Sequence, residues 1–324
     1  AFCNGGDPMY SPSQRIWGYE TPDGSFAQFT RVQAQQLMPR PKHLTWEESA
    51  CYTLTLATAY RMLFGHHPHE LKPGQNVLVW GASGGLGSFA IQLINTAGAN
   101  AIGVISDESK RQFVMDLGAK GVINRKDFKC WGQLPKVNTP EYKEWFNEAR
   151  RFGKAIWEIT GKGVNVDMVF EHPGEATFPV STFVVKRGGM VVICAGTTGF
   201  NLTMDARYVW MHQKRVQGSH FAHLKQAAAA NYAFCTIDPN VGIQPSLLPN
   251  PDQTGPQTTT LASPILIDAA EHRPKKTIHI VPEDIRILID ELHDQPIVGS
   301  QIERRRAGRH IAEMQDQQSF TRLR

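Results

Sequence analysis

Apolar residues change their spacing along the chain, and this spacing predicts the secondary structure. From Thr45 to Phe64 they recur every three or four residues, and Thr45 with two glutamates in the next turn is typical of a helix start. After this segment, short runs rich in β-branched residues alternate with helical segments. We predict strands at 76–80, 101–105, 121–124, 166–170 and 189–194, and helices at 86–97, 110–117 and 176–186. Such alternation is typical of an α/β fold with a doubly wound parallel sheet, here over residues 51–200.

The segment before this region has a different pattern. Residues 1–50 contain many glycine and proline turn signals around short extended stretches such as 26–32, which predicts irregular β structure. The first residues read as the middle of a loop, so we expect the chain to be incomplete at its N-terminus. Residues 201–231 are expected to return toward the first segment.

The last part of the chain is different again. Residues 232–264 are dense in Pro, Thr, Gln and Asn, which is typical of loop or disorder. We therefore predict an atypical, divergent and partly disordered tail over 232–324, in which only 277–292 shows a strand followed by an amphipathic helix. The basic run at 303–310 is expected to be solvated.

Residues 125–155 read as an insertion that is too apolar to be a solvated linker. Contact with another subunit is the favoured interpretation, and folding back onto its own domain is the alternative. The aromatic residues concerned are Phe128, Trp131, Tyr142, Trp145, Phe146 and Phe152.

Composition narrows the classes of function. The formal charge is only +4 over 324 residues, and the basic residues are scattered, which argues against nucleic-acid binding. No apolar run reaches the roughly 18 to 20 residues that a membrane helix needs. The five cysteines are widely spaced, so neither a disulfide framework nor a structural zinc site is predicted, and a reducing cytoplasm is expected. His66, His67 and His69 share a loop without nearby helical carboxylates, and no metal is assigned.

A glycine-rich turn joins the strand at 76–80 to the helix at 86–97. Ala82, Gly84 and Gly87 occupy the three small-residue positions of a dinucleotide fingerprint, so the backbone can approach a pyrophosphate at the helix N-terminus. This context predicts a Rossmann domain that binds a nucleotide. The residues expected at the phosphates are Ser83, Gly84, Gly85, Leu86 and Gly87.

The end of the next strand indicates which nucleotide is bound. An NAD site usually has an acidic residue there that binds the ribose, whereas this strand ends at the neutral Ser106. Lys110 and Arg111 follow one helical turn later, where cations can pair with a 2′-phosphate. These residues favour NADPH, although Asp107 is close, and the two cations are alternatively the solvated face of a helix.

Several motifs occur together and in order, and their combination resembles the crotonyl-CoA carboxylase/reductase family, close to the ethylmalonyl-CoA-forming type. The resemblance covers roughly residues 1–231. Members are zinc-free enzymes of the medium-chain dehydrogenase/reductase superfamily, which implies that residues 1–50 are part of a GroES-like β catalytic domain. The motifs are Trp17-Gly-Tyr-Glu-Thr21, Ser25-Phe-Ala-Gln-Phe29, Ala50-Cys-Tyr-Thr-Leu-Thr-Leu-Ala-Thr-Ala-Tyr-Arg61, the turn Trp80–Gly87, Phe170-Glu-His-Pro-Gly174 and Gly218-Ser-His-Phe221.

The resemblance implies a reaction. Hydride from NADPH reaches the β-carbon of an α,β-enoyl-CoA, and the resulting carbanion at the α-carbon attacks carbon dioxide; crotonyl-CoA gives ethylmalonyl-CoA. Protonation of the same carbanion gives plain reduction, so the site has to hold carbon dioxide and exclude proton donors. The family also implies a homo-oligomer, expected to be a tetramer.

Site residues follow from the motif positions. The resemblance implies Tyr19, Glu20 and His220 as the carbon dioxide pocket, and Arg207 at the phosphates of coenzyme A. An asparagine that completes the pocket in the family has no counterpart here. Nicotinamide contacts are implied at Thr58, His172, Ala195, Gly196 and Thr197, most of which follow the carboxyl ends of predicted strands, where open α/β sheets bind ligands.

Alternatives remain open at this point. The chain is either a reductive carboxylase, a plain NADPH-dependent enoyl-CoA or quinone-type reductase, or an inactive nucleotide-binding fragment. For the tail, a shifted reading frame or chimaeric gene competes with genuine divergence, because the family motifs end near Asn231.

Overall fold

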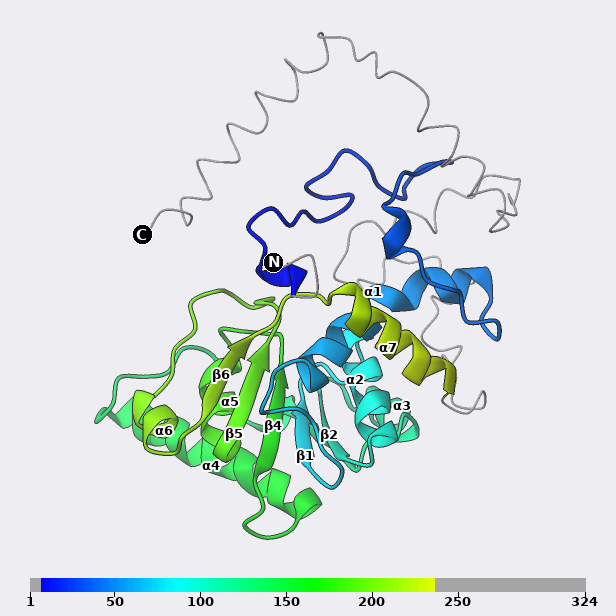
Figure 1. Cartoon of the computed structure of the whole chain (residues 1–324). Helices are drawn as coiled ribbons and strands as arrows, with labels where there is room; N and C mark the ends of the chain where they lie inside the picture. Colours follow the sequence, from blue (N-terminus) through cyan, green and yellow to red (C-terminus); the bar gives the residue numbers. More distant parts are fainter. Residues whose placement is uncertain (1–6, 237–324) are drawn as a thin grey trace. The chain divides into compact units, whose positions relative to one another are not determined.

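The computed structural model describes residues 7–236, and six parallel strands form the central sheet of this part of the chain (Figure 1). Their order is β3-β2-β1-β4-β5-β6, so the direction of winding reverses between β1 and β4. This is the doubly wound arrangement that places a ligand site at the reversal point, and the predicted fold class is confirmed. The strands are β1 (Asn76–Val79), β2 (Asn100–Ile105), β3 (Gly121–Asn124), β4 (Val166–Glu171), β5 (Val185–Ile193) and β6 (Arg215–Gly218).

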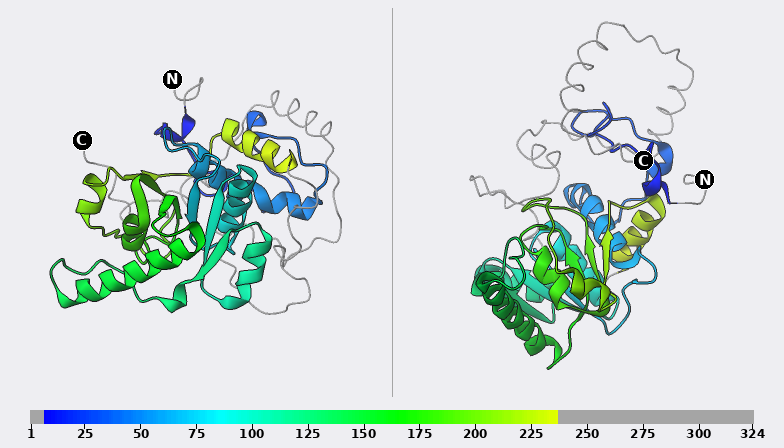
Figure 2. Two further views of the ribbon diagram at one scale, coloured as in Figure 1. Left: turned by 90° about the horizontal axis from the view of Figure 1, so that it is seen from below. Right: turned by 90° about the vertical axis from the view of Figure 1, so that its left-hand side faces the viewer.

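Helices cover both faces of the sheet, because side chains alternate along each buried strand. In β1, Val77 and Val79 pack with helices α1 and α2, whereas Leu78 and the following Trp80 pack with α4 and α5. Figure 2 shows α4 along one face and α1 with α2 on the other. The helices are α1 (Trp46–Phe64), α2 (Gly85–Thr96), α3 (Arg111–Asp116), α4 (Pro140–Thr160), α5 (Phe178–Val184), α6 (Ala206–Trp210) and α7 (Leu224–Thr236).

Helix α1 begins where the sequence predicted. The Thr45 hydroxyl accepts the Glu48 backbone N–H at 3.2 Å, and the Glu48 carboxylate accepts the Thr45 N–H at 2.8 Å. This reciprocal capping satisfies two donors that a helix start leaves unpaired. At the other end of the described chain, α7 packs against α1, and the Tyr52 hydroxyl contacts the Asn231 side chain. Helix α7 continues through the point at which the tail was predicted to diverge.

The aromatic segment after β3 belongs to its own domain. Most of it forms α4, the crossover helix that leads from β3 to β4. Trp145 and Phe152 are buried against the sheet, and the Phe152 ring stacks on Trp80 with centroids 5.8 Å apart. The favoured interpretation of an intersubunit insertion was therefore wrong for these buried side chains, since a crossover helix needs an apolar face to pack on the sheet.

The predicted β structure near the N-terminus is also wrong within the described residues. From residue 7 to the start of α1, the only regular elements are short 3-10 helices at Pro8–Tyr10 and Ala34–Gln36. Residues 26–32 have no neighbouring strand in the described chain, and a strand without a partner cannot satisfy its backbone hydrogen bonds. The expectations for 237–264, 277–292 and 303–310 lie outside the described residues.

Candidate functional site

The turn between β1 and α2 presents backbone donors at a helix start. The N–H groups of Gly85, Leu86 and Gly87 are the first of α2 and have no acceptor within the helix. The N-cap residue Gly84 supplies no side-chain acceptor for them either. The partial positive charge of a helix N-terminus adds to these donors. Ser83 immediately precedes this group. The sequence-predicted phosphate residues therefore lie together at one helix N-terminus, an arrangement that suits an anion.

Small residues in the turn are required by close backbone contacts. A Cβ on Gly87 would lie 2.3 Å from the Gly81 carbonyl oxygen and 2.7 Å from the Ala82 Cα. A Cβ on Gly103 of β2 would lie 3.0 Å from the Ala82 Cβ, so Ala82 fits only because its neighbour is glycine. The helix thus starts directly against the strands, as the fingerprint predicts.

The end of β2 carries the residues that bear on the nucleotide type. The Asp107 carboxylate accepts hydrogen bonds from the Ser109 N–H at 3.0 Å and the Ser109 hydroxyl at 2.7 Å, and these bonds hold its pKa below the usual value. Asp107 is therefore engaged as a cap of its own turn. The neutral Ser106 precedes it at the tip of the strand.

Cations surround this turn, and one of them was not predicted. The Arg111 guanidinium pairs with Glu108 and donates to the Val122 carbonyl at 2.6 Å. Lys126 lies beside the same turn, with its Nζ 3.9 Å from Asp107 Oδ2. The missed signal was topological: Lys126 follows β3, the neighbour of β2, so both strand ends reach the same edge of the sheet.

The loops after β4 and β5 pack directly on each other and on the phosphate turn. His172 Nε2 lies 3.1 Å from the Trp80 carbonyl oxygen, and a Cβ on Gly81 would lie 2.6 Å from that nitrogen. Thr197 donates its N–H to the His172 carbonyl at 3.4 Å. Gly196 is equally close-packed, since a Cβ there would lie 2.8 Å from the Gly199 oxygen. These sequence-predicted residues are thus brought together at the carboxyl ends of the strands.

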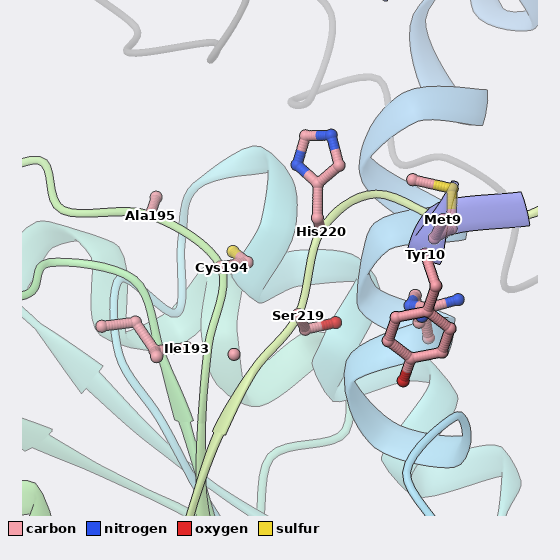
Figure 3. Close-up of a pocket in the computed structure, with 9 residues that line it drawn as sticks. Met9, Tyr10, Ile193, Cys194, Ala195, Ser219 and His220 are labelled. Atoms are coloured by element: carbon pink, nitrogen blue, oxygen red, sulfur yellow. The ribbon is translucent and has the colours of Figure 1, made fainter. Parts of the chain in front are cut away.

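A pocket of about 450 Å³ adjoins these loops (Figure 3). Cys194 and Ala195 line it after β5, and Ser219 and His220 line it after β6. In Figure 3 the His220 imidazole and the Ser219 hydroxyl point in different directions. The pocket is completed by Met9, Tyr10, Arg61, Ile193 and Gly218.

Arg61 and Ser219 were not singled out from the sequence. Arg61 is only 3% exposed; it donates to Asp7 and to Gln226, each at 2.8 Å. The buried Ser219 hydroxyl has no hydrogen-bond partner among the described residues. Arg61 is the last residue of the family motif on α1. Its place in the pocket depends on contacts of α1 with the first residues and with α7, which the sequence does not show.

Other predicted residues lie elsewhere. Tyr19 is 71% exposed, and the Glu20 carboxylate accepts the Ile16 N–H at 2.7 Å; neither lines the pocket that contains His220. Thr58 is buried in α1, and its hydroxyl donates to the Leu54 carbonyl at 2.7 Å. The roles assigned to these three residues stay predictions.

Arg207 lies at the opposite end of β6 from His220, because α6 precedes that strand (Figure 1). Its guanidinium pairs with Asp205 through two nitrogens, with the shortest contact at 2.6 Å, and this raises the Arg207 pKa. A pocket of about 960 Å³ includes Arg207 together with Lys143, His212 and aromatic side chains. Cations and aromatic rings suit a nucleotide phosphate and base.

Neither a metal cluster nor a membrane span is found in residues 7–236. No group of three or more His, Cys, Asp and Glu side chains there is arranged to hold a metal ion. None of the helices in this part of the chain is long and apolar enough to cross a bilayer. The cytoplasmic location stays a prediction.

The fold and the turn after β1 define a Rossmann-type dinucleotide-binding domain. The family model described as "Zinc-binding dehydrogenase" matches residues 85–234. The chain is 88% identical over 229 residues to the crotonyl-CoA carboxylase/reductase of Cereibacter sphaeroides, which is 71% of this chain and 53% of that protein. The chain spans about half the length of the curated relatives it matches.

Solved structures agree with this result. A structure named crotonyl-CoA carboxylase/reductase is 78% identical, with a TM-score of 0.72, over 72% of this chain and 55% of that one. The 2-octenoyl-CoA carboxylase reductase CinF, solved with NADP and 2-octenoyl-CoA, is 40% identical, with a TM-score of 0.65, over 71% of this chain and 51% of its own. Over the matched region, the chain is similar to crotonyl-CoA carboxylase/reductases, and the resemblance stated from the motifs is confirmed.

Proposed function

We propose that this chain binds NADPH and forms the nucleotide-binding part of a reductive carboxylase of α,β-enoyl-CoA. The observation that carries the proposal is the turn after β1, where the N–H groups of Gly85, Leu86 and Gly87 begin α2 and the missing side chain of Gly87 lets the helix start directly against Gly81 and Ala82. Relatives that share this region include structures solved with NADP. The residues present therefore fit a dinucleotide.

The 2′-phosphate is assigned to the edge formed by the ends of β2 and β3. Ser106 leaves room for the phosphate, and Asp107 is engaged by Ser109 rather than by a ribose. Lys110 and Lys126 supply positive charge, with Arg111 beside them. This arrangement favours NADPH over NADH.

The nicotinamide end is assigned to the loops after β4 and β5. Bound there, NADPH supplies the hydride that reduces the enoyl thioester at its β-carbon. His172, Ala195, Gly196 and Thr197 border that position, and Thr58 is its predicted contact from α1. The backbone packing between the two loops fixes their spacing before a ligand binds.

Carboxylation of the substrate's α-carbon is assigned to the pocket that contains His220. A hydrogen bond from His220 to a carbon dioxide oxygen would hold the electrophile there. Glu20, expected to orient it through water, and Tyr19, expected to exclude bulk solvent, do not line this pocket among the described residues, so His220 carries this part of the proposal. Arg61 lines this pocket as a buried side chain whose charge is paired with Asp7. Arg207, with Lys143 and His212, is the proposed contact for the coenzyme A phosphates.

We further propose that the active form is a homo-oligomer. Strand β6 lies at the edge of the described sheet, and its residues alternate between partly buried and exposed. Exposed apolar side chains at Phe200, Met204, Trp210 and Met211 lie in the segment that leads to this edge. Light scattering of the native protein tests this proposal by measuring the mass of the assembly. We expect the mass of a tetramer.

Labelled bicarbonate separates the candidate activities. With NADPH, crotonyl-CoA and carbon-13 bicarbonate, we expect labelled ethylmalonyl-CoA. The variant His220→Ala should lower the labelled share of the product about tenfold or more, because the electrophile loses its hydrogen bond while hydride transfer continues. His43→Ala, at an exposed histidine that lines neither pocket, is the matched control. Mass spectrometry of the acyl-CoA products reads the result.

Two outcomes contradict the carboxylase. Unlabelled butyryl-CoA as the sole product with the unmodified chain would identify a plain enoyl-CoA reductase. Binding of NADPH without turnover would identify a nucleotide-binding fragment.

A further inference from the structure

A carboxyl group is buried directly behind the cofactor loops. Glu171 is the last residue of β4 and is 0% exposed. No Lys, Arg or His forms an ion pair with it anywhere in residues 7–236. A buried carboxylate without a cation has to be held by neutral donors.

Three neutral donors converge on Glu171. Its carboxylate accepts the Gly174 N–H at 3.1 Å, the Thr177 hydroxyl at 2.8 Å and the Ser181 hydroxyl at 2.5 Å. Ser181 is fixed in this role, because its oxygen accepts the Trp80 indole N–H at 2.9 Å and its single proton goes to Glu171. The ionised carboxylate is the form that accepts from all three.

This hydrogen-bond cluster connects the two loops that border the proposed nucleotide site. Through Ser181 it reaches Trp80, which leads into the phosphate turn; through Gly174 it holds the loop that carries His172. The loops also touch directly, since His172 Nε2 lies 3.1 Å from the Trp80 oxygen. A change at Glu171 therefore reaches both loops at once.

Both protonation states of Glu171 are accessible near neutral pH. Burial raises its pKa to about 7, and hydrogen bonds from Ser181, Thr177 and the backbones of Gly174 and His172 oppose that rise. The titratable neighbours stay neutral there: burial raises the pKa of Cys194 to about 12 and lowers that of His172. Protonation would place a hydrogen on one Glu171 oxygen, which the Gly174 N–H cannot accept and which a hydroxyl could accept only by reversing its own hydrogen bond.

We propose that Glu171 is a positioning residue, whose ionised form holds the loops after β1 and β4 in the arrangement that binds the nicotinamide half of NADPH. The inference rests on the proposed function of this site. It assigns to Glu171 a pH-dependent contribution to cofactor binding, although the residue does not touch the cofactor.

The test compares two ligands as pH changes. NADPH fills the whole site, whereas 2′-phospho-ADP-ribose lacks the nicotinamide but keeps the pyrophosphate and the 2′-phosphate, so it reports the ionisation of the 2′-phosphate itself. For the full chain, the dissociation constant of NADPH divided by that of 2′-phospho-ADP-ribose should rise about fivefold to tenfold from pH 8 to pH 6, because the loops lose a hydrogen bond. Fluorescence and calorimetric titrations measure the two constants.

Variants assign the effect to Glu171. In Glu171→Gln the ratio should stay at its weak, low-pH value at every pH. Asp167→Asn is the matched control: this carboxylate lies at the amino end of the same strand, pairs with Lys186 at 2.5 Å and should leave the profile unchanged. In Thr177→Val, which keeps the carboxyl group but removes one donor, the midpoint should move to higher pH.

The outcomes separate this inference from the function on which it rests. If the unmodified chain binds both ligands but the ratio does not change with pH, or if Glu171→Gln keeps the unmodified profile, Glu171 has no such role. Should Glu171→Gln fail to fold, an unshifted midpoint in Thr177→Val overturns the inference equally. If the unmodified chain binds neither ligand at pH 8, the proposed nucleotide site itself is wrong.

Discussion

Replacing Gly87 with alanine is expected to destabilise the domain by about 3 kcal/mol and to weaken NADPH binding more than a hundredfold. The new Cβ would lie 2.3 Å from the Gly81 oxygen and 2.7 Å from the Ala82 Cα. Both neighbours are backbone atoms, so relief requires α2 to move away from β1. That movement takes the N–H groups of Gly85 and Leu86 away from the phosphates. Thermal unfolding and NADPH titration measure the two effects.

Gly153→Ala is the matched control for this substitution. Gly153 lies inside α4, and a Cβ there would meet no atom within 4 Å. Alanine should therefore stabilise the domain by roughly 0.5 to 1 kcal/mol. Equal melting temperatures for Gly87→Ala and the unmodified chain would show that the turn is not packed as described.

Removing the cations near Ser106 is expected to reduce NADPH affinity without changing NADH affinity. Lys126→Gln and Lys110→Gln should each weaken NADPH binding about tenfold, since each removes a charge-assisted contact with the 2′-phosphate. The double variant should lose about a hundredfold. Parallel titrations with NADPH and NADH measure this difference.

Lys120→Gln is the control for lost positive charge. Lys120 precedes β3 and Lys126 follows it, so the two lysines lie at opposite ends of one strand. Lys120→Gln should leave both affinities unchanged. An equal loss of NADPH and NADH affinity in Lys126→Gln would show that the lysine acts on the phosphates common to both nucleotides, or on folding.

The central sheet could be predicted from the sequence because its signals are local. Strands buried on both faces give short apolar runs, and a nucleotide turn has to combine small residues with a helix start. The capping of α1 by Thr45 and Glu48 is equally local. Each of these features is decided by residues a few positions apart, which are visible in one sequence.

The errors arose where partners distant in sequence decide the structure. Residues 26–32 contain β-forming residues, but a strand also needs a neighbouring strand, and the described chain provides none. Phe152 and Trp145 looked like interface aromatics, because their real partners, Trp80 for Phe152 and Phe183 for Trp145, lie far away in the sequence. The amphipathic spacing of the crossover segment was the signal that indicated packing on the sheet rather than on another subunit.

Site residues were missed for a similar reason. Glu171 lies inside a motif that was recognised, yet its role depends on Ser181 and Trp80, which are 101 positions apart. Lys126 follows the strand beside Ser106, and strand order alone brings them to one edge. Applying the carboxyl-end rule to neighbouring strands would have found Lys126.

Titration of the full chain with NADPH and NADH tests the central claim most directly, namely that residues 7–236 form an NADPH site at the turn after β1. Nicotinamide fluorescence follows binding of both nucleotides under identical conditions. We expect saturable binding of NADPH with about a hundredfold preference over NADH, as the two lysines near Ser106 together require. Absence of saturable binding, or equal affinity for the two nucleotides, would contradict the account.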